Sequence, residues 1–182
     1  GRTHAAFGSA RFDVEDAMRV PVHTLAGALH ADFRVPSVDY LSLLRATRAF
    51  THDESEVVKA FERAVFNVLF NNRDDHCKNF AFRLGRDRRW RLAPGYDLTF
   101  NVGPGGEHQM DVCGEARRIT RAQLLQLAAK GGIKPRAACA CLERLLGEVA
   151  SFETRIRAQP ARLTTIRTII DRVRENQAAL HD

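Results

Sequence analysis

The stretch Asn71-Asn72-Arg73-Asp74-Asp75-His76-Cys77-Lys78-Asn79 decides how this chain folds, because it separates a strongly apolar helix from a predicted hairpin. Before it, residues 53–70 carry apolar side chains at helical spacing, and Asp53 followed by Glu56 is typical of a capped helix start. The stretch itself is too polar for a core and too short for a linker between domains. We therefore expect a loop that is held in a fixed position at the end of a buried helix.

Two short alternating segments follow this polar loop and predict a β-hairpin. They are Phe80-Ala81-Phe82 and Trp90-Arg91-Leu92, joined around Gly85-Arg86-Asp87. The hairpin leads to Pro94-Gly95-Tyr96-Asp97-Leu98, and the glycine-rich run 103–106 then predicts a flexible loop. Residues His108 to Val112 are predicted to form a further short strand.

Most of the remaining sequence is predicted to be helical. The pattern from Val22 to Phe33 is weakly helical, and Ser37 is predicted to cap a second helix. The fold class that we predict is therefore α+β, predominantly α-helical. Further helix signals lie at Thr120 with Gln123 (a capping box), Gly131-Gly132 (a helix end), Pro135 (a first turn) and the apolar stripe Leu163, Ile166, Ile169, Ile170 and Val173.

Composition predicts one soluble domain that spans residues 1–182. With 45% hydrophobic and 27% charged residues, the chain can bury a core, and no apolar run is long enough to cross a bilayer. The net charge of +6 makes contact with phosphates plausible, although an ordinary solvated basic surface explains it equally well. Four cysteines without C-x-x-C spacing are typical of reduced thiols, so we expect a cytoplasmic protein and no zinc site.

The chemistry is predicted to lie in the polar loop and just after the hairpin. Asp74 is followed five positions later by Asn79, and Asp97 comes directly after the hairpin. In kinases an Asp in this position orients the attacking hydroxyl, while an Asn five residues on and an Asp after a short hairpin hold Mg²⁺. Either Asp alone is better explained as a turn residue, but together these residues predict phosphoryl transfer.

At this level of detail the sequence resembles the HipA-type serine/threonine kinase toxins. Their catalytic loop reads N-x-D-x-H-x-K-N, as residues 72–79 do here, and their metal-binding Asp lies in a motif that matches Tyr96-Asp97-Leu98. The resemblance implies the C-terminal lobe of a protein-kinase-like fold, with a short β-hairpin next to the catalytic loop. It also implies use of ATP and Mg²⁺.

The same resemblance assigns roles to individual residues. Arg11-Phe12-Asp13 is similar to the family's hinge motif, so residues 1–14 are expected to form a hinge-like entry segment, and Phe12 is either a nucleotide contact or an ordinary core residue. His76 either supports the loop or approaches the phosphates. The implied site is Asp74 and Lys78 for catalysis, Asn79 and Asp97 for the metal, and Phe12, His76, Cys77, Lys78, Asn79, Tyr96 and Asp97 for the nucleotide.

The lobe that covers ATP in kinases is expected outside this sequence, because only nine residues precede Ala10. We therefore expect poor activity from this chain alone. The N-terminal lobe is supplied by the same chain or by a companion chain, or the protein is a degenerate remnant without it; the sequence does not distinguish these alternatives. The resemblance implies a protein substrate, a DNA-binding antitoxin and direct or indirect contact with DNA. The alternative hypothesis is a non-catalytic, kinase-like module that holds an antitoxin or nucleic acid through arginines at 83–91 and 117–121.

Overall fold

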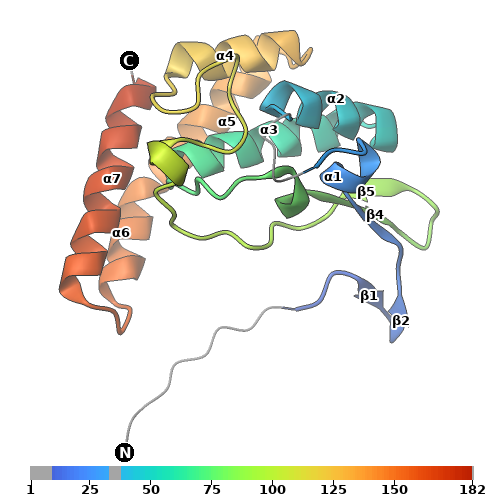
Figure 1. The fold of residues 1–182 in the computed structure, drawn as a ribbon, viewed down its shortest axis with the longest axis horizontal. Helices are drawn as coiled ribbons and strands as arrows, with labels where there is room; N and C mark the ends of the chain where they lie inside the picture. The colour runs from blue at the N-terminus through green and yellow to red at the C-terminus, as the bar shows by residue number, and fades with distance from the viewer. Residues whose placement is uncertain (1–9, 33–37, 182) are drawn as a thin grey trace, which may run out of the picture.

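A computed structural model of the chain describes residues 10–32 and 38–181, and it is an α+β fold in which about half of the chain is helical (Figure 1). The strands are β1 Val14–Glu15, β2 Met18–Arg19, β3 Val22–Thr24, β4 Ala81–Leu84 and β5 Trp90–Leu92. The helices are α1 Leu25–Ala28, α2 Tyr40–Thr51, α3 Glu54–Leu69, α4 Arg121–Lys130, α5 Pro135–Gly147, α6 Val149–Arg157 and α7 Leu163–His181. Two 3₁₀ turns, η1 Cys77–Asn79 and η2 Pro104–Gly106, complete the elements.

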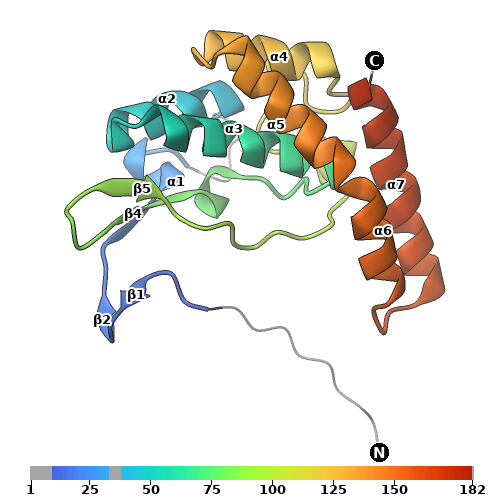
Figure 2. The ribbon, with the colours of Figure 1, turned by 180° about the vertical axis from the view of Figure 1, so that it is seen from behind.

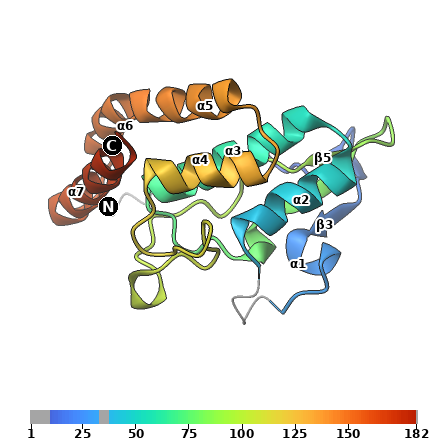
Figure 3. The same cartoon turned by 90° about the horizontal axis from the view of Figure 1, so that it is seen from above.

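Helix α3 lies at the centre of the helical body, with α2 and α5 packed against it (Figure 3). Its predicted start is confirmed, since the Asp53 side chain accepts a hydrogen bond from the backbone N–H of Ser55 at 2.8 Å. Glu56 does not close a capping box, however. Its buried carboxylate instead accepts hydrogen bonds from the backbone N–H of Leu92 at 2.9 Å and from Lys59 Nζ at 2.6 Å. Glu56 therefore attaches α3 to the last strand.

The predicted hairpin is present and belongs to a three-stranded antiparallel sheet with the order β3-β4-β5. The weak helical prediction for residues 22–33 was wrong at its start, because Val22 to Thr24 form strand β3 opposite β4. Only the following turn, α1, is helical, and Thr24 caps it. Ser37 lies outside the described residues. The side chain that caps α2 is Asp39, which accepts from the backbone N–H of Ser42 at 2.7 Å.

The first two strands form a small hairpin that stands apart from the helical body (Figure 1). Its turn residues Asp16 and Ala17 have φ angles of 45° and 63°, as the tight turns that join two antiparallel strands require. Arg83 pairs with Glu15, and Arg86 pairs with Asp16 at 2.5 Å. These ion pairs connect the small hairpin to the β4-β5 hairpin.

Helix α5 packs against α3, helix α4 packs against α2 and α5, and the pair α6–α7 stands at the end of α3 (Figure 2). The predicted capping box of α4 is confirmed, with Thr120 and Gln123 bonded reciprocally, and α5 starts at Pro135 as expected. The predicted strand at 108–112 was wrong. The backbone there bonds mainly to a nearby turn, since His108 N–H donates to Ala116 O at 2.8 Å and Val112 N–H donates to Glu115 O at 2.8 Å. In addition, Asp111 O accepts from the Tyr40 N–H at the start of α2 at 3.1 Å.

A hydrophobic cluster joins these layers around α3. Its large, fully buried members include Phe61 and Leu69 of α3, Phe80 just before β4, Phe82 of β4, and Leu142 of α5. Within the described residues, no helix is both long and apolar enough to cross a membrane. The polar loop lies between this cluster and the surface, and the core therefore fixes the position of the loop from one side.

Candidate active site

The polar loop begins where α3 ends, and it is attached there by side chains and backbone together. Asn71 takes the left-handed conformation with φ 55°, which Asn tolerates better than most residues. Asn72 N–H then donates to Asn67 O at 2.9 Å. Asn71 also exchanges bonds with Asn101, donating from Nδ2 at 2.9 Å and accepting from the Asn101 N–H at 3.0 Å. The chain therefore reverses sharply after α3 and stays beside residue 101.

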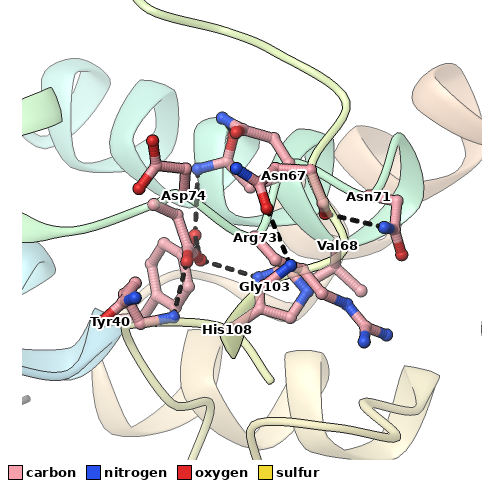
Figure 4. Close-up of polar contacts among 12 residues, drawn as sticks. Tyr40, Asn67, Val68, Asn71, Arg73, Asp74, Gly103 and His108 are labelled. Atoms are coloured by element: carbon pink, nitrogen blue, oxygen red, sulfur yellow. Dashed lines mark hydrogen bonds and ion pairs between the residues drawn. The ribbon is translucent and has the colours of Figure 1, made fainter. Parts of the chain in front are cut away.

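Asp75 forms the buried face of the loop. Its carboxylate, 0% exposed, accepts hydrogen bonds from the Tyr40 hydroxyl at 2.5 Å and from the Gln109 N–H at 2.8 Å. The Nδ1 atom of buried His108 lies 2.8 Å from the same carboxylate (Figure 4). Asn67 Nδ2 donates to the Tyr40 hydroxyl at 2.9 Å and extends the network into α3. Sequence analysis missed this function of Asp75.

Asp74 lies on the opposite face of the loop. Its side chain is 40% exposed, and its carboxylate points away from Tyr40 and His108 (Figure 4). Asn79 Nδ2 donates to the backbone carbonyl oxygen of Asp74 at 2.8 Å, which closes the loop between the two predicted site residues. Because the Asn79 amide nitrogen is used in this way, its amide oxygen is directed elsewhere and is available as a ligand.

Asp97 follows the β4-β5 hairpin, in a segment that is attached to the polar loop at two points. Asn101 forms a backbone bridge with Asn72, and the Tyr96 hydroxyl donates to Lys78 O. Asp97 lies between these attachments, is exposed and has φ 53°. This left-handed conformation is strained for a residue with a side chain and is often found at functional sites.

Phe12 stacks on Tyr96, with ring centroids 5.4 Å apart and an interplanar angle of 28°. Phe12 is partly exposed, so it is not an ordinary core residue. Burial raises the pKa of Tyr96 to about 12, and the charge of Asp97 adds to the shift while Arg63 opposes it. Of the predicted hinge-like segment, residues 1–9 lie outside the described residues, and the described part reaches the site through this stack.

The remaining predicted site residues, His76, Cys77 and Lys78, differ in their exposure to solvent. His76 Nε2 lies 3.7 Å from an oxygen of Asp74, and Lys78 is exposed. The Cys77 side chain belongs to the hydrophobic core, and burial raises the pKa of its thiol. Any contact between Cys77 and a nucleotide would therefore involve its backbone.

Arg63 of α3 supports the segment before Tyr96, and nothing in its sequence context had indicated this. Its Nη2 donates to Ala93 O at 2.8 Å, while the buried Nη1 has no hydrogen-bond partner. Burial lowers the pKa of this guanidinium. Together with the bond from Glu56 to β5, Arg63 connects the central helix to the point where the chain leaves the hairpin.

The side chains of Asn79 and Asp97 suit Mg²⁺, which completes its coordination with phosphates and water, better than they suit a metal that only protein side chains coordinate. Asn79 offers an amide oxygen and Asp97 a carboxylate, the oxygen ligands that Mg²⁺ prefers when phosphates and water complete its shell. Among the described residues, no group of three or more His, Cys, Asp and Glu side chains is placed to hold a metal. The four cysteines are free thiols.

Three of the five arginines of the β4-β5 hairpin pair with acids. Arg83 and Arg86 bond to the first hairpin, and Arg91 pairs with Asp87. The pairs of Arg86 and Arg91 are exposed, and such pairs contribute little. Among the described residues, no acid forms an ion pair with Arg88 or Arg89.

Comparisons with known proteins identify a matching family and a similar fold. The family described as HipA-like C-terminal domain matches residues 1–152. No curated protein sequence matches the chain. Among solved structures, a chain from the complex of the Shewanella oneidensis MR-1 toxin–antitoxin proteins HipA and HipB with operator DNA superposes with a TM-score of 0.72 at 18% sequence identity. The match covers 93% of this chain but only 46% of that chain.

Proposed function

Because the chain belongs to the HipA-like C-terminal domain family, we propose that it is the C-terminal lobe of a serine/threonine protein kinase that uses ATP and Mg²⁺. The observation that carries this proposal is the hydrogen bond from Asn79 Nδ2 to the Asp74 carbonyl oxygen. It holds a candidate base and a candidate metal ligand in one rigid turn. We further propose that residues 1–182 form a single lobe.

In this proposal Asp74 orients the Ser or Thr hydroxyl of the protein substrate and accepts its proton. The carboxylate is suited to this because it is partly exposed and is not used by the network under the loop. Lys78 is exposed in the same loop and stabilises negative charge on the transferring group. His76 and the Phe12–Tyr96 stack border the nucleotide site.

Asn79 and Asp97 would hold Mg²⁺. The ion, when bound, neutralises charge on the phosphate oxygens. The protein contributes two oxygen ligands that are held before binding. The side chain of Asn79 is held by its bond to the Asp74 carbonyl oxygen, and the backbone around Asp97 is held by the attachments at Tyr96 and Asn101. Preorganisation of this kind lowers the free energy needed to assemble the site.

The whole protein's partners are also part of this proposal. The chain spans less than half the length of the HipA-complex chain that it resembles, so the lobe that covers ATP would come from elsewhere in the same or a companion chain. By analogy with that complex, which contains HipB and operator DNA, we propose a DNA-binding antitoxin as partner in the cytoplasm. DNA contact would be made directly or through that partner.

Transfer of labelled phosphate from Mg²⁺·ATP by the polypeptide with its natural flanking segments tests the proposal. We expect Asp74→Asn to abolish transfer and to leave nucleotide binding intact, whereas Asp97→Ala weakens Mg²⁺-dependent nucleotide binding. Asp87→Ala is the matched control, because Asp87 lies in the hairpin turn and pairs only with nearby groups. Transfer at the normal rate by Asp74→Asn would remove Asp74 from the mechanism.

A wild-type protein that folds but transfers no phosphate would favour the alternative, a non-catalytic module. Such a module would bind antitoxin or nucleic acid electrostatically, and its affinity would fall steeply as salt is added. Arg83, Arg86 and Arg91 would have to exchange their ion pairs with acids for contacts with phosphates in this role.

A further inference from the structure

A second pocket, of about 400 Å³, lies beside the polar loop and separate from the candidate active site. Its walls come from the end of α3, the segment that precedes α4 and one face of α7. Arg73, Arg117, Arg118 and Arg172 line it together with a single carboxylate, that of Glu175. Segments far apart in the sequence therefore bring four cations to one concave surface.

The acids near this pocket neutralise it only in part. Arg172 pairs with Glu175 at 2.6 Å, and Arg117 pairs with Glu107 at 3.1 Å. Each of these four side chains is at least 45% exposed, and ion pairs in such positions contribute little and exchange readily. Within the described chain, no acid forms an ion pair with Arg118. Glu115 also lies close, because its carboxylate accepts hydrogen bonds from the backbone N–H groups of Arg117 and Arg118. The pocket lining itself carries four arginines and one carboxylate.

Arg73 gives the pocket a buried cation without a carboxylate partner. It is 9% exposed, and its guanidinium donates to the backbone carbonyls of Gly106 and Arg117, while its Nε is buried without a partner. Burial lowers the pKa of Arg73, as does the charge of Arg172, although Asp75 opposes the shift. A buried cation of this kind is costly unless an anion compensates it.

We propose that this pocket binds a phosphate monoester, carried by a phosphorylated Ser or Thr side chain or present as free phosphate. Arginine suits this ligand because its planar fork donates two parallel hydrogen bonds to phosphate oxygens. The pocket is larger than one phosphate, and Val68, Ile119 and Ala179 add apolar surface that suits the carbon chain of a phosphorylated residue. Binding here does not depend on catalysis by Asp74.

Isothermal titration of the whole natural polypeptide, without Mg²⁺, tests this proposal. The probes are inorganic phosphate, a phosphoserine peptide and the same peptide without phosphate. The variant Arg118→Gln/Arg172→Gln removes two pocket cations, and Arg162→Gln/Arg167→Gln is the matched control. The control removes the same charge at exposed positions near the start of α7, outside the pocket lining. Circular dichroism melting verifies that both variants fold.

We expect the phosphoserine peptide to bind, and the pocket variant to bind it about tenfold or more weakly, as the loss of charged hydrogen bonds predicts. The control should bind as the wild type does. If inorganic phosphate binds, the phosphoserine peptide does not, and the pocket variant binds inorganic phosphate about tenfold or more weakly, the site is assigned to the free anion.

Three results would overturn the proposal. The first is that the unphosphorylated peptide binds as tightly as the phosphoserine peptide. The second is that the control variant loses as much affinity as the pocket variant. The third is that neither inorganic phosphate nor the phosphoserine peptide binds. Duplex DNA that binds through Arg118 and Arg172 more tightly than the peptide would reassign the surface to nucleic acid. None of these results bears on phosphate transfer, so a failure here is distinguishable from a failure of the proposed kinase activity.

Discussion

Asp74 and Asp75 are adjacent and chemically identical, yet they lie on opposite faces of one loop. Asp75 is fully buried and is bonded to groups from α2 and from residues 108–109, whereas the carboxylate of Asp74 is 40% exposed. Because the buried carboxylate fixes the backbone of the loop, the exposed one is held in position without making structural bonds of its own. A buried, structural carboxylate and the exposed carboxylate for which we propose catalysis are thus on neighbouring residues.

The largest difference between the two faces is expected in stability. Asp75→Ala leaves the Tyr40 hydroxyl and the Gln109 N–H without their acceptor, so we expect a loss of about 3 kcal/mol in the free energy of unfolding. Asp74→Ala should change it by no more than about 0.5 kcal/mol. Urea denaturation measures both. Equal losses would show that the loop has no distinct structural face.

Removal of one donor from the buried face should have a smaller effect. Tyr40→Phe deletes a hydroxyl that donates to Asp75 and accepts from Asn67, and we expect it to lower stability by about 1–2 kcal/mol. Tyr96→Phe is the control, since it deletes a hydroxyl with one bond in a half-exposed site. A larger loss for Tyr96→Phe in the same denaturation experiment would contradict the comparison.

The exposed face was easier to predict from sequence than the buried one. The helix 53–70, the polar loop and the hairpin all follow from local spacing, and the roles proposed for Asp74, Asn79 and Asp97 rest on motifs. The burial of Asp75 depends on Tyr40 and His108, which are 35 and 33 residues away. No local pattern distinguishes two neighbouring aspartates in this way.

The predictions for β3 and for residues 108–112 were wrong for the same physical reason: a strand needs a partner. Strand β3 was predicted to be helical, and residues 108–112 were predicted to form a strand. The three residues of β3 have little preference of their own and become a strand only by pairing with β4, more than fifty residues later. Conversely, His108 to Val112 alternate as a strand does but find no partner strand. Their backbone bonds to the nearby turn at 115–116 instead.

The ionisation of the two tyrosines should sharpen the comparison, because they are the only tyrosines in the chain. Burial and then the charge of Asp75 raise the pKa of Tyr40 well above its ordinary value, and burial raises that of Tyr96 from 10.0 to about 12. Folding favours the neutral phenols, so their contribution to stability is complete below pH 10 and is lost as the pH rises through the folded-state pKa values.

Ultraviolet titration measures this directly through the phenolate absorbance. We expect little phenolate at pH 11 in the folded protein and full ionisation once urea unfolds it. The variant Tyr40→Phe isolates the transition of Tyr96. An ordinary midpoint near pH 10 in that folded variant would show that Tyr96 is not buried against Phe12 and Lys78.

The smallest expected effect concerns the thiols. Cys77, on the buried side of the loop, and Cys141 of α5 are at most 5% exposed, and burial raises the pKa of both. Cys113 and Cys139 are more exposed. Burial also raises the pKa of Cys113, so the contrast rests on exposure. A disulfide reagent should modify Cys113 and Cys139 faster than Cys77 and Cys141. Rapid modification of Cys77 in the folded protein, located by peptide mapping, would show that the loop opens.

The most direct test of the account compares phosphate transfer by Asp74→Asn and Asp75→Asn in the polypeptide with its natural flanking segments, at a temperature where both are folded. We predict that Asp74→Asn loses transfer at least about a hundredfold, as general-base variants do, with unchanged melting temperature. Asp75→Asn should melt at a lower temperature and keep most of its rate per folded molecule. The reverse pattern, with transfer retained by Asp74→Asn and lost by Asp75→Asn, would contradict the division of the loop into a reactive and a structural face.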